Sequence, residues 1–177
     1  MLAPLLVITR DRAAYERLCR RIVTTFTNTL NPYVAERMAK DSLLVTNSEV
    51  DLVLADRLAD TALTRGSGEA SLPFFQVCKA LSQYRQGHFA AAIQWAEKPL
   101  NNSPVHARAN ACAVLAMAHW QLGQKDEARA MLAKGDALAP QITFVPNAQN
   151  VGGEWLPWLF ARISLDEATE MIASDKN

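Results

Sequence analysis

Three His and three Cys are the residues of this chain that could bind a metal or act as nucleophiles. No two of them stand at ligand spacing such as C-x-x-C or H-x-x-x-H, so the sequence predicts no metal site. Cys112 and His119 share a predicted helix, but about 10 Å of axial rise separates them and they cannot touch. His119 precedes Trp120 and is interpreted as a packed or groove-lining imidazole rather than a catalytic base.

Acidic and basic side chains show no catalytic pattern either. Six carboxylates follow helical periodicity and indicate a solvated face, with no paired-carboxylate motif: Glu36, Asp41, Glu49, Asp51, Asp56 and Asp60. Arg17, Arg20 and Arg21 could bind phosphate, but Glu16 and Arg20 form an ordinary i, i+4 pair, which favours a surface role. We therefore expect no catalytic residue and no cofactor in this chain.

The composition favours one folded unit. The chain has 177 residues, half of them apolar, which is enough to bury a continuous core. Lys and Arg equal Asp and Glu at 18 each, so no overall charge favours nucleic acid or an anionic membrane. No apolar run is long enough to cross a bilayer, and the opening MLAPLLVI is interpreted as folded chain. Cys19, Cys78 and Cys112 are widely spaced and are expected to be buried, reduced thiols, which favours a cytoplasmic location.

Four residues recur at a fixed distance, and this repeat organises the elements that must position any functional side chain. Tyr84, Gly87, Ala92 and Pro104 reappear 36 residues later as Trp120, Gly123, Ala128 and Pro140. A helix, a Gly-centred turn, a second helix with small inward residues and a closing Pro are typical of the tetratricopeptide helical hairpin, whose period is about 34 residues.

Apolar periodicity and turn residues divide the chain into helices. Asp11 is expected to cap the first clear amphipathic helix, which continues to Phe26. Pro99 is expected to end the helix that starts at His88 early. Residues 2–8 look like the end of a longer helix, Thr46 to Ser48 like a turn and cap, and residues 140–153 like a loop. Further helices are predicted over residues 33–45, 49–64, 72–85, 105–122, 125–138 and 154–173.

Together these elements predict an all-α fold, a right-handed α-α superhelix of tetratricopeptide-like antiparallel hairpins. Residues 1–177 are expected to form a single domain, with clear repeats at about 72–104 and 105–140. Ala55 stands 37 residues before Ala92, which indicates a divergent repeat at about 33–67. The helix at about 154–173 is expected to cap the apolar face of the last repeat.

Most of the chain resembles a known family of tails. The run from Asp11 to Leu165 resembles the tetratricopeptide-like C-terminal regions of large bacterial serine/threonine protein kinases, of the type abundant in planctomycetes. The resemblance rests on DRAAYERLCRRI, PYVAERMAKDSLL, YRQGHFAAAIQWAEKPL, AVLAMAHWQLGQKDEARAMLAKGDAL and EWLPWLFARISLDEA. It implies a helical appendage that follows a kinase domain and is not itself catalytic. The chain has no Gly-rich phosphate loop, HRD or DFG, and Pro99 stands where the repeat consensus prefers Ala. Such kinases can carry a membrane span before the tail, which would place the repeats on the far side.

A binding surface is the better functional hypothesis, because the first helix of each hairpin lines the concave side of such a stack. Matching the turn register predicts groove positions at Arg37, Lys40, Phe74, Val77, Leu81, Tyr84, Arg85, Asn110, Ala113, Met117, Trp120 and Gln121. Some of these must be core residues. Tyr84 and Trp120 are either binding anchors or aromatic residues that pack on the following helix. The Lys/Asn pattern of carboxylate-clamp tail binders is not evident.

Two classes of function follow. The chain is expected to be a non-catalytic protein–protein interaction scaffold that binds a protein or peptide through its concave face, as an appendage of a signalling kinase. The alternative is a structural spacer or oligomerisation segment, with self-association and no open groove. An open concave face that displays Tyr84, Arg85 and Trp120 would favour recruitment, and a filled one would favour the spacer. Nucleic acid and membrane insertion are not expected.

Overall fold

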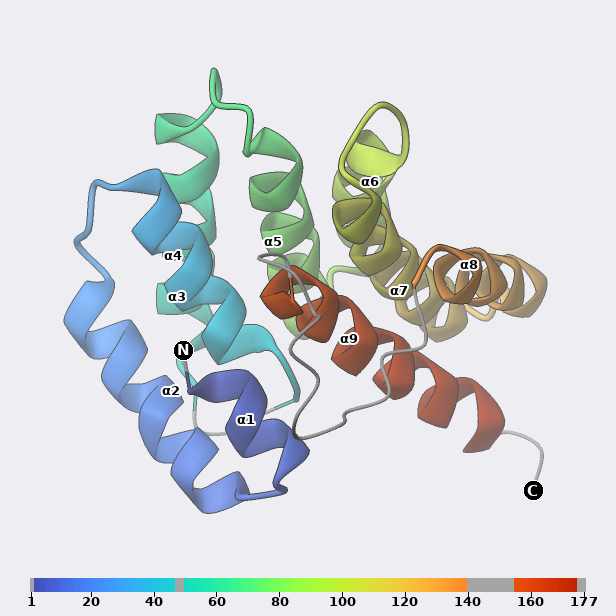
Figure 1. The fold of residues 1–177 in the computed structure, drawn as a ribbon, viewed down its shortest axis with the longest axis horizontal. Coiled ribbons are helices and arrows are strands. Elements are labelled where there is room, and N and C mark those ends of the chain that lie inside the picture. Colours follow the sequence, from blue (N-terminus) through green and yellow to red (C-terminus); the bar gives the residue numbers. More distant parts are fainter. Residues whose placement is uncertain (1, 47–49, 140–154, 175–177) are drawn as a thin grey trace.

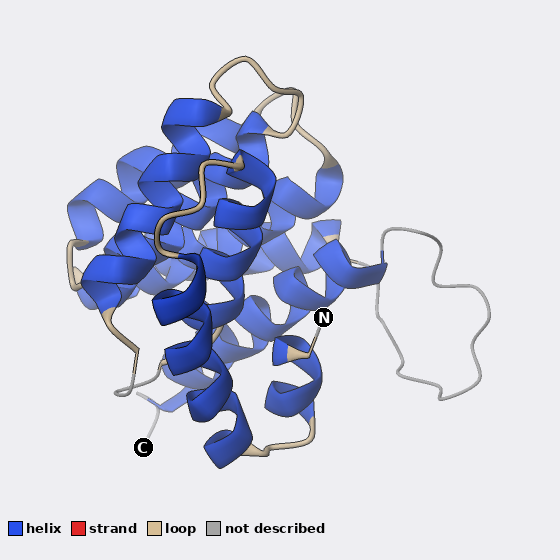
Figure 2. Cartoon of the chain, turned by 90° about the vertical axis from the view of Figure 1, so that its left-hand side faces the viewer, coloured by secondary structure: helices blue, strands red, loops and turns tan. Residues whose placement is uncertain are grey.

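The computed structural model describes residues 2–46, 50–139 and 155–174, and within these ranges the chain forms helices and no strand (Figure 2). This architecture confirms the predicted all-α class, an α-α superhelix. The helices are α1 (Ala3–Ile8), α2 (Arg12–Phe26), α3 (Pro32–Leu43), α4 (Leu52–Arg65), α5 (Leu72–Arg85), α6 (Phe89–Glu97), α7 (Val105–Gln121), α8 (Lys125–Leu138) and α9 (Trp155–Ala173), with a 3₁₀ turn at Lys98–Leu100.

Three antiparallel hairpins form the body of the molecule (Figure 1). Helices α3 and α4, α5 and α6, and α7 and α8 pack in pairs, and α4 and α6 also pack on the helix that follows each pair. Helices α3, α5 and α7 contact one another in succession and form one layer. We call the side of this layer that faces α9 the inner surface.

The 36-residue repeat is visible in the hydrogen bonds of its two turns. Gly87 and Gly123 both have positive φ angles, of 80° and 74°, which non-Gly residues adopt only with strain. The amide after each Gly donates to the carbonyl five residues back, at 2.9 Å in the first turn and 3.0 Å in the second, which closes a Schellman motif. A side-chain hydrogen bond also spans each turn. It joins Gln83 to His88 in the first turn and His119 to Gln124 in the second, so Gln and His exchange positions between the two repeats.

Small residues allow the helix axes to approach closely in the core. The matched positions Ala55, Ala92 and Ala128 are fully buried, one in the second helix of each hairpin. Helix α7 is central, because α5, α6, α8 and α9 all pack on it, and its residues 109–118 are all buried. Cys19, Cys78 and Cys112 are buried, as predicted, and these three described residues form no disulfide.

Most predicted helix boundaries lie within a few residues of those observed, and the reasons for the differences are local. The helix predicted to start at Glu49 begins at Leu52. The Asp51 side chain caps it there, because it accepts hydrogen bonds from the amides of Val53 and Leu54 at 3.0 and 3.1 Å. Helix α6 ends at Glu97, as expected from Pro99. The predicted turn over residues 46–48 and the predicted loop over 140–153 fall largely or wholly outside the described residues.

Candidate functional site

Helix α9 lies along the inner surface as well as at the end of the repeats. Figure 1 shows it crossing in front of α5, between α3 on one side and α7 and α8 on the other. It packs closely on α7 and α8, where Leu165 is fully buried. Gly135 of α8 provides the space, since a Cβ there would stand 2.6 Å from Leu165 Cδ2. The expected capping contact with the last repeat is therefore present, and α9 also covers much of the surface predicted as a groove.

Arg85 is the main polar link between α9 and the hairpins. Its guanidinium donates to both carboxylate oxygens of Glu167 at 2.6 Å, in a bidentate ion pair. The same group donates, at 2.9 Å, to the carbonyl oxygens of Leu43 and Leu44. These carbonyls lie at the end of α3 and have no helical partner. Only 4% of the Arg85 side chain is exposed. Arg85 therefore binds a segment of its own chain.

The aromatic pair at the repeat turns packs within the molecule. Tyr84 is 7% exposed, and its hydroxyl contacts the Met171 sulfur of α9 at 3.8 Å. Its ring packs on that of Phe89, the first residue of α6, with 5.7 Å between the ring centroids. Trp120 stands at the position of the next repeat that is equivalent to Tyr84. It packs on Lys125 of α8, whose Nζ lies 5.0 Å from the ring centroid. These contacts favour the interpretation that both residues pack on the following helix.

The other predicted groove residues divide into buried and accessible groups. Met117 and Asn110, 0% and 4% exposed, are covered on all sides, so the expectation that they face an open groove is corrected. The reason is the central place of α7, with α9 on the side that the repeat pattern leaves open. Val77, Leu81 and Ala113 are buried as well. Gln121 is exposed, and its amide donates to the Met171 sulfur at 3.7 Å.

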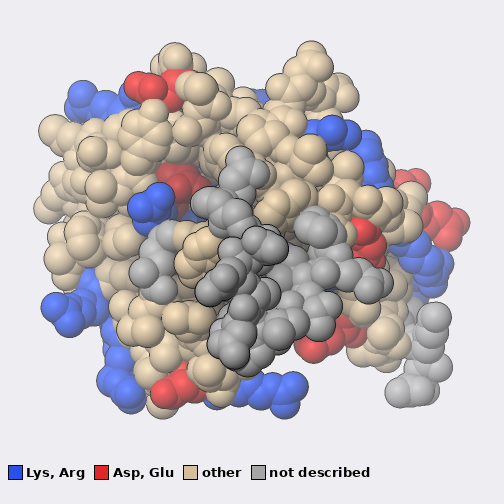
Figure 3. Space-filling model, in the orientation of Figure 1, with Lys and Arg blue, Asp and Glu red and all other residues tan. Residues whose placement is uncertain are grey.

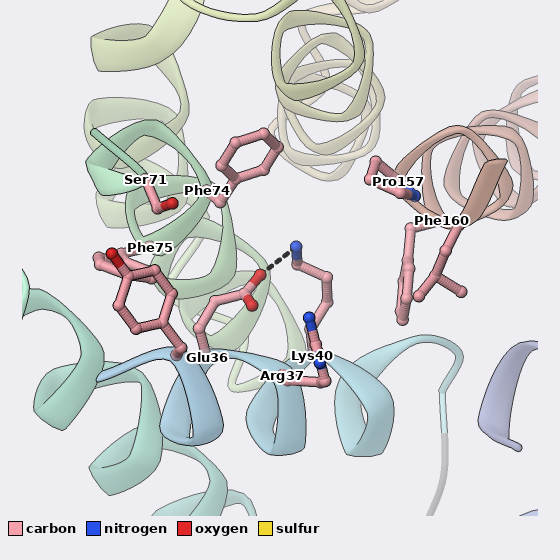
Figure 4. Close-up of a pocket in the computed structure, with 10 residues that line it drawn as sticks. Glu36, Arg37, Lys40, Ser71, Phe74, Phe75, Pro157 and Phe160 are labelled. Carbon is pink, nitrogen blue, oxygen red and sulfur yellow. Dashed lines mark ion pairs between the residues drawn. The ribbon is translucent and has the colours of Figure 1, made fainter. Parts of the chain in front are cut away.

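The remaining three predicted residues, Arg37, Lys40 and Phe74, line one pocket at the start of the inner surface. We call this the aromatic pocket, and its volume is about 210 Å³. Helices α3, α5 and α9 form its walls, and Figure 4 shows the side chains turned toward the shared space. Its lining is Tyr33, Glu36, Arg37, Lys40, Ser71, Phe74, Phe75, Leu156, Pro157 and Phe160.

A buried ion pair lies at the centre of the aromatic pocket. The Lys40 ammonium pairs with Glu36 one turn earlier on α3, and their side chains are 10% and 13% exposed. The Lys40 nitrogen also lies over the rings of Phe74 and Phe160, at 5.5 and 5.4 Å from their centroids. Aromatic ring faces and a carboxylate thus replace the water that a buried ammonium loses.

Further aromatic contacts hold the pocket walls. Phe74 stacks on His106 of α7 at 5.0 Å, and His106 meets Trp158 of α9 edge-on at 5.7 Å. On the other side, the Tyr33 hydroxyl donates to Glu69 at 2.8 Å, and its ring packs edge-on against Phe75. His106 of α7 therefore links the walls that α5 and α9 supply, and the Tyr33–Phe75 contact links those that α3 and α5 supply.

Clusters of His, Cys, Asp and Glu side chains are where a metal ion or a reactive thiolate would be expected. Among them, no cluster of three His, Cys, Asp or Glu side chains converges as metal ligands would. Burial raises the pKa of the Cys78 and Cys112 thiols, so neither is poised as a thiolate nucleophile. Burial, and then the charge of Glu36, raise the pKa of Asp41 to about 6, but Asp41 does not line the aromatic pocket.

Charge is distributed without a dominant sign. On the face drawn in Figure 3, basic and acidic side chains are interspersed among a larger uncharged surface. None of the described helices is long and apolar enough to span a membrane.

Comparison with known families identifies the repeats. Residues 73–98 and 109–134 each match the tetratricopeptide repeat family, and the two matches are offset by the same 36 residues as the turn glycines. Fold and matches together define a tetratricopeptide-repeat-like region, a class of helical repeat that generally mediates protein–protein interaction. That property supports a scaffold role for this chain. Searches among curated proteins and among solved structures gave no match.

The sequence did not single out Tyr33, Glu36 or Phe160 as site residues, nor Glu167 and Met171 as partners of the inner surface. A signal was present on α9. Phe160, Glu167 and Met171 are spaced by 7 and 4 residues and so share one face of the helix.

Proposed function

We propose that this chain is a non-catalytic protein-interaction module whose accessible binding site is the aromatic pocket. The observation that carries the proposal is the pocket's construction, a fixed ring of aromatic side chains around a buried Lys40–Glu36 pair, with the exposed Arg37 at its rim. Concave apolar sites with a few placed polar groups are the usual form of a binding site. A partner would insert one protruding side chain there.

The position of α9 limits which part of the inner surface can recruit a partner. Arg85 and Tyr84 are engaged by Glu167 and Met171, so an extended peptide cannot lie along the whole concave face while α9 is in place. Tyr33 and Arg37 are both exposed, so the end of the inner surface that they occupy is accessible beside α9. Recruitment through this end is the form of the scaffold hypothesis that the geometry supports best.

The resemblance to the tails of bacterial serine/threonine kinases supports a place for the chain beside a signalling kinase. In that arrangement the kinase domain would lie outside these residues, and the repeats would hold a substrate or regulator close to it. The balanced charge of 18 basic and 18 acidic residues agrees with a protein partner rather than a nucleic acid.

A structural spacer is the second candidate, and the position of α9 favours it. A stack whose inner surface is occupied by its own helix is rigid and needs no partner to bury Arg85. Under this hypothesis the aromatic pocket is a packing gap between α9 and the first hairpins.

Site-directed photo-crosslinking separates the two candidates. A benzoyl-phenylalanine in place of Tyr33, which is 45% exposed on the pocket wall, should give a discrete protein adduct in cells. The control carries the same group in place of Phe26, a comparably exposed aromatic residue at the end of α2 and outside the pocket lining. An adduct at 33 and not at 26 supports the interaction module. Equal labelling, or none at either position, favours the spacer.

A further inference from the structure

The aromatic pocket has room for one side chain rather than a small-molecule ligand. Its volume of about 210 Å³ is below the range of about 300–1,000 Å³ that is usual for small-molecule sites. Phe74, Phe75, Leu156, Pro157 and Phe160 supply carbon surface around it. An apolar or aromatic side chain would bury its surface against these walls.

The charged groups that line the pocket differ in what they can still bind. Glu36 and Lys40 neutralise each other, and the Lys40 ammonium is further engaged by two aromatic rings. Arg37 lines the same pocket, is exposed, and makes no hydrogen bond or ion pair with any other described residue. Arg37 is therefore the charged lining residue that retains its full capacity to donate.

Two other carboxyl groups lie near these residues without lining the pocket. Glu69 accepts a hydrogen bond from the Tyr33 hydroxyl at 2.8 Å. Asp41 is 3% exposed and follows Lys40 on α3. Neither lies within hydrogen-bond distance of Arg37. The pocket also borders the first turns of α5 and α9, where the helix dipoles add partial positive charge.

From this arrangement we infer the chemistry of the partner, an inference that rests on the proposed function. The partner segment carries an apolar or aromatic side chain beside a carboxylate: the side chain fills the aromatic pocket and the carboxylate binds the Arg37 guanidinium. A planar guanidinium presents paired donors that match the two oxygens of a carboxylate, which a neutral amide cannot reproduce.

Four short peptides test this chemistry against the full chain. The probe is the capped hexapeptide Ser-Gly-Phe-Glu-Gly-Ser, and three relatives replace Glu by Gln, Glu by Lys, or Phe by Ala. Binding is measured by chemical-shift titration of ¹⁵N-labelled protein at low ionic strength. The Glu peptide should bind about three- to fivefold more tightly than the Gln peptide, the range expected for one partly exposed charged pair. The Ala peptide should not shift the signals of α3, α5 and α9.

Variants of the protein assign the preference to one residue. Arg37→Glu should reverse it in favour of the Lys peptide. The control Arg57→Glu places the same charge change on an exposed Arg of α4, outside the pocket lining, and should leave the preference unchanged.

Equal affinity for the Glu and Gln peptides, or an equal effect of both Arg variants, overturns the inference and leaves the proposed function intact. The same holds if no peptide binds while the crosslinker at Tyr33 still captures a partner. If no peptide binds and no adduct forms, both the inference and the proposed function fail.

Discussion

Removal of Arg85 should destabilise the fold far more than removal of a surface arginine. The Arg85 guanidinium makes 2.6 Å bonds to both Glu167 oxygens and 2.9 Å bonds to the carbonyls of Leu43 and Leu44. Arg85→Ala leaves those two carbonyls and the Glu167 carboxylate without their main partner. Breaking a buried pair in this way costs about 3–5 kcal/mol. The expected loss in the free energy of unfolding is therefore about 3–5 kcal/mol.

A double-mutant cycle tests the link between Arg85 and Glu167. Glu167→Ala removes the bidentate partner but leaves Arg85 its two carbonyl acceptors, so we expect a smaller loss of about 1.5–3 kcal/mol. The double variant should lose less than the sum of the single variants, because the second deletion removes the orphaned carboxylate. The exchanged pair Arg85→Glu with Glu167→Arg should not restore stability, since a carboxylate at position 85 cannot donate to the α3 carbonyls.

Urea unfolding followed by circular dichroism gives these energies, and tryptophan fluorescence adds a second probe, to which α9 contributes two of the four Trp residues, Trp155 and Trp158. The matched control is Arg12→Ala. Arg12 pairs with Glu16 at 2.8 Å, but its side chain is 74% exposed. That variant should lose about 0.3–0.5 kcal/mol. The reasoning is refuted if Arg85→Ala costs no more than this control.

Three further predictions concern other contacts. Gly135→Ala should destabilise the protein in urea despite the better helix propensity of Ala, worth about 1 kcal/mol, because the new methyl group overlaps the buried Leu165; a gain in stability would contradict the packing. Gly87→Ala and Gly123→Ala should each cost about 1–2 kcal/mol, since both have positive φ and open space around them, and clearly unequal losses would contradict their equivalence. The pKa of Asp41 is raised to about 6 in the folded state, so the free energy of unfolding should fall as pH rises from about 4 to 6 and stay reduced above that range. The Asp41→Asn variant should lack this fall when both proteins are measured by urea unfolding at pH 4 to 7. The same fall in both proteins would exclude Asp41 as its source.

The repeat architecture could be predicted from the sequence because its signals are local. The Gly87 and Gly123 turns need a residue that accepts positive φ, and the matched Ala positions need small side chains at helix crossings. Pro99 has no N–H to donate to a helical hydrogen bond, and this holds whatever other helices the segment contacts. Each signal depends on a few neighbouring residues, so it can be recognised without knowing the tertiary structure.

The path of α9 could not be predicted in the same way, because the helix has two contact faces. One face includes Trp158 and Leu165 and faces α7 and α8, as an end cap requires. The second face includes Phe160, Glu167 and Met171 and reaches α3, α5 and α7. Periodicity shows that a face is apolar or charged, but it does not show which distant helix that face meets.

The same limit explains what happened to the predicted binding residues. Arg and aromatic side chains on the first helix of a hairpin require partners, and a sequence pattern expresses that requirement without indicating whether the partner is another protein or the same chain. Arg85 and Tyr84 meet theirs in α9, through Glu167 and Met171. Arg37 lies on the same surface, yet no described residue satisfies its guanidinium. Arg37 lacks the intramolecular partner that Arg85 has, so it is the position where an external ligand would form the most new hydrogen bonds.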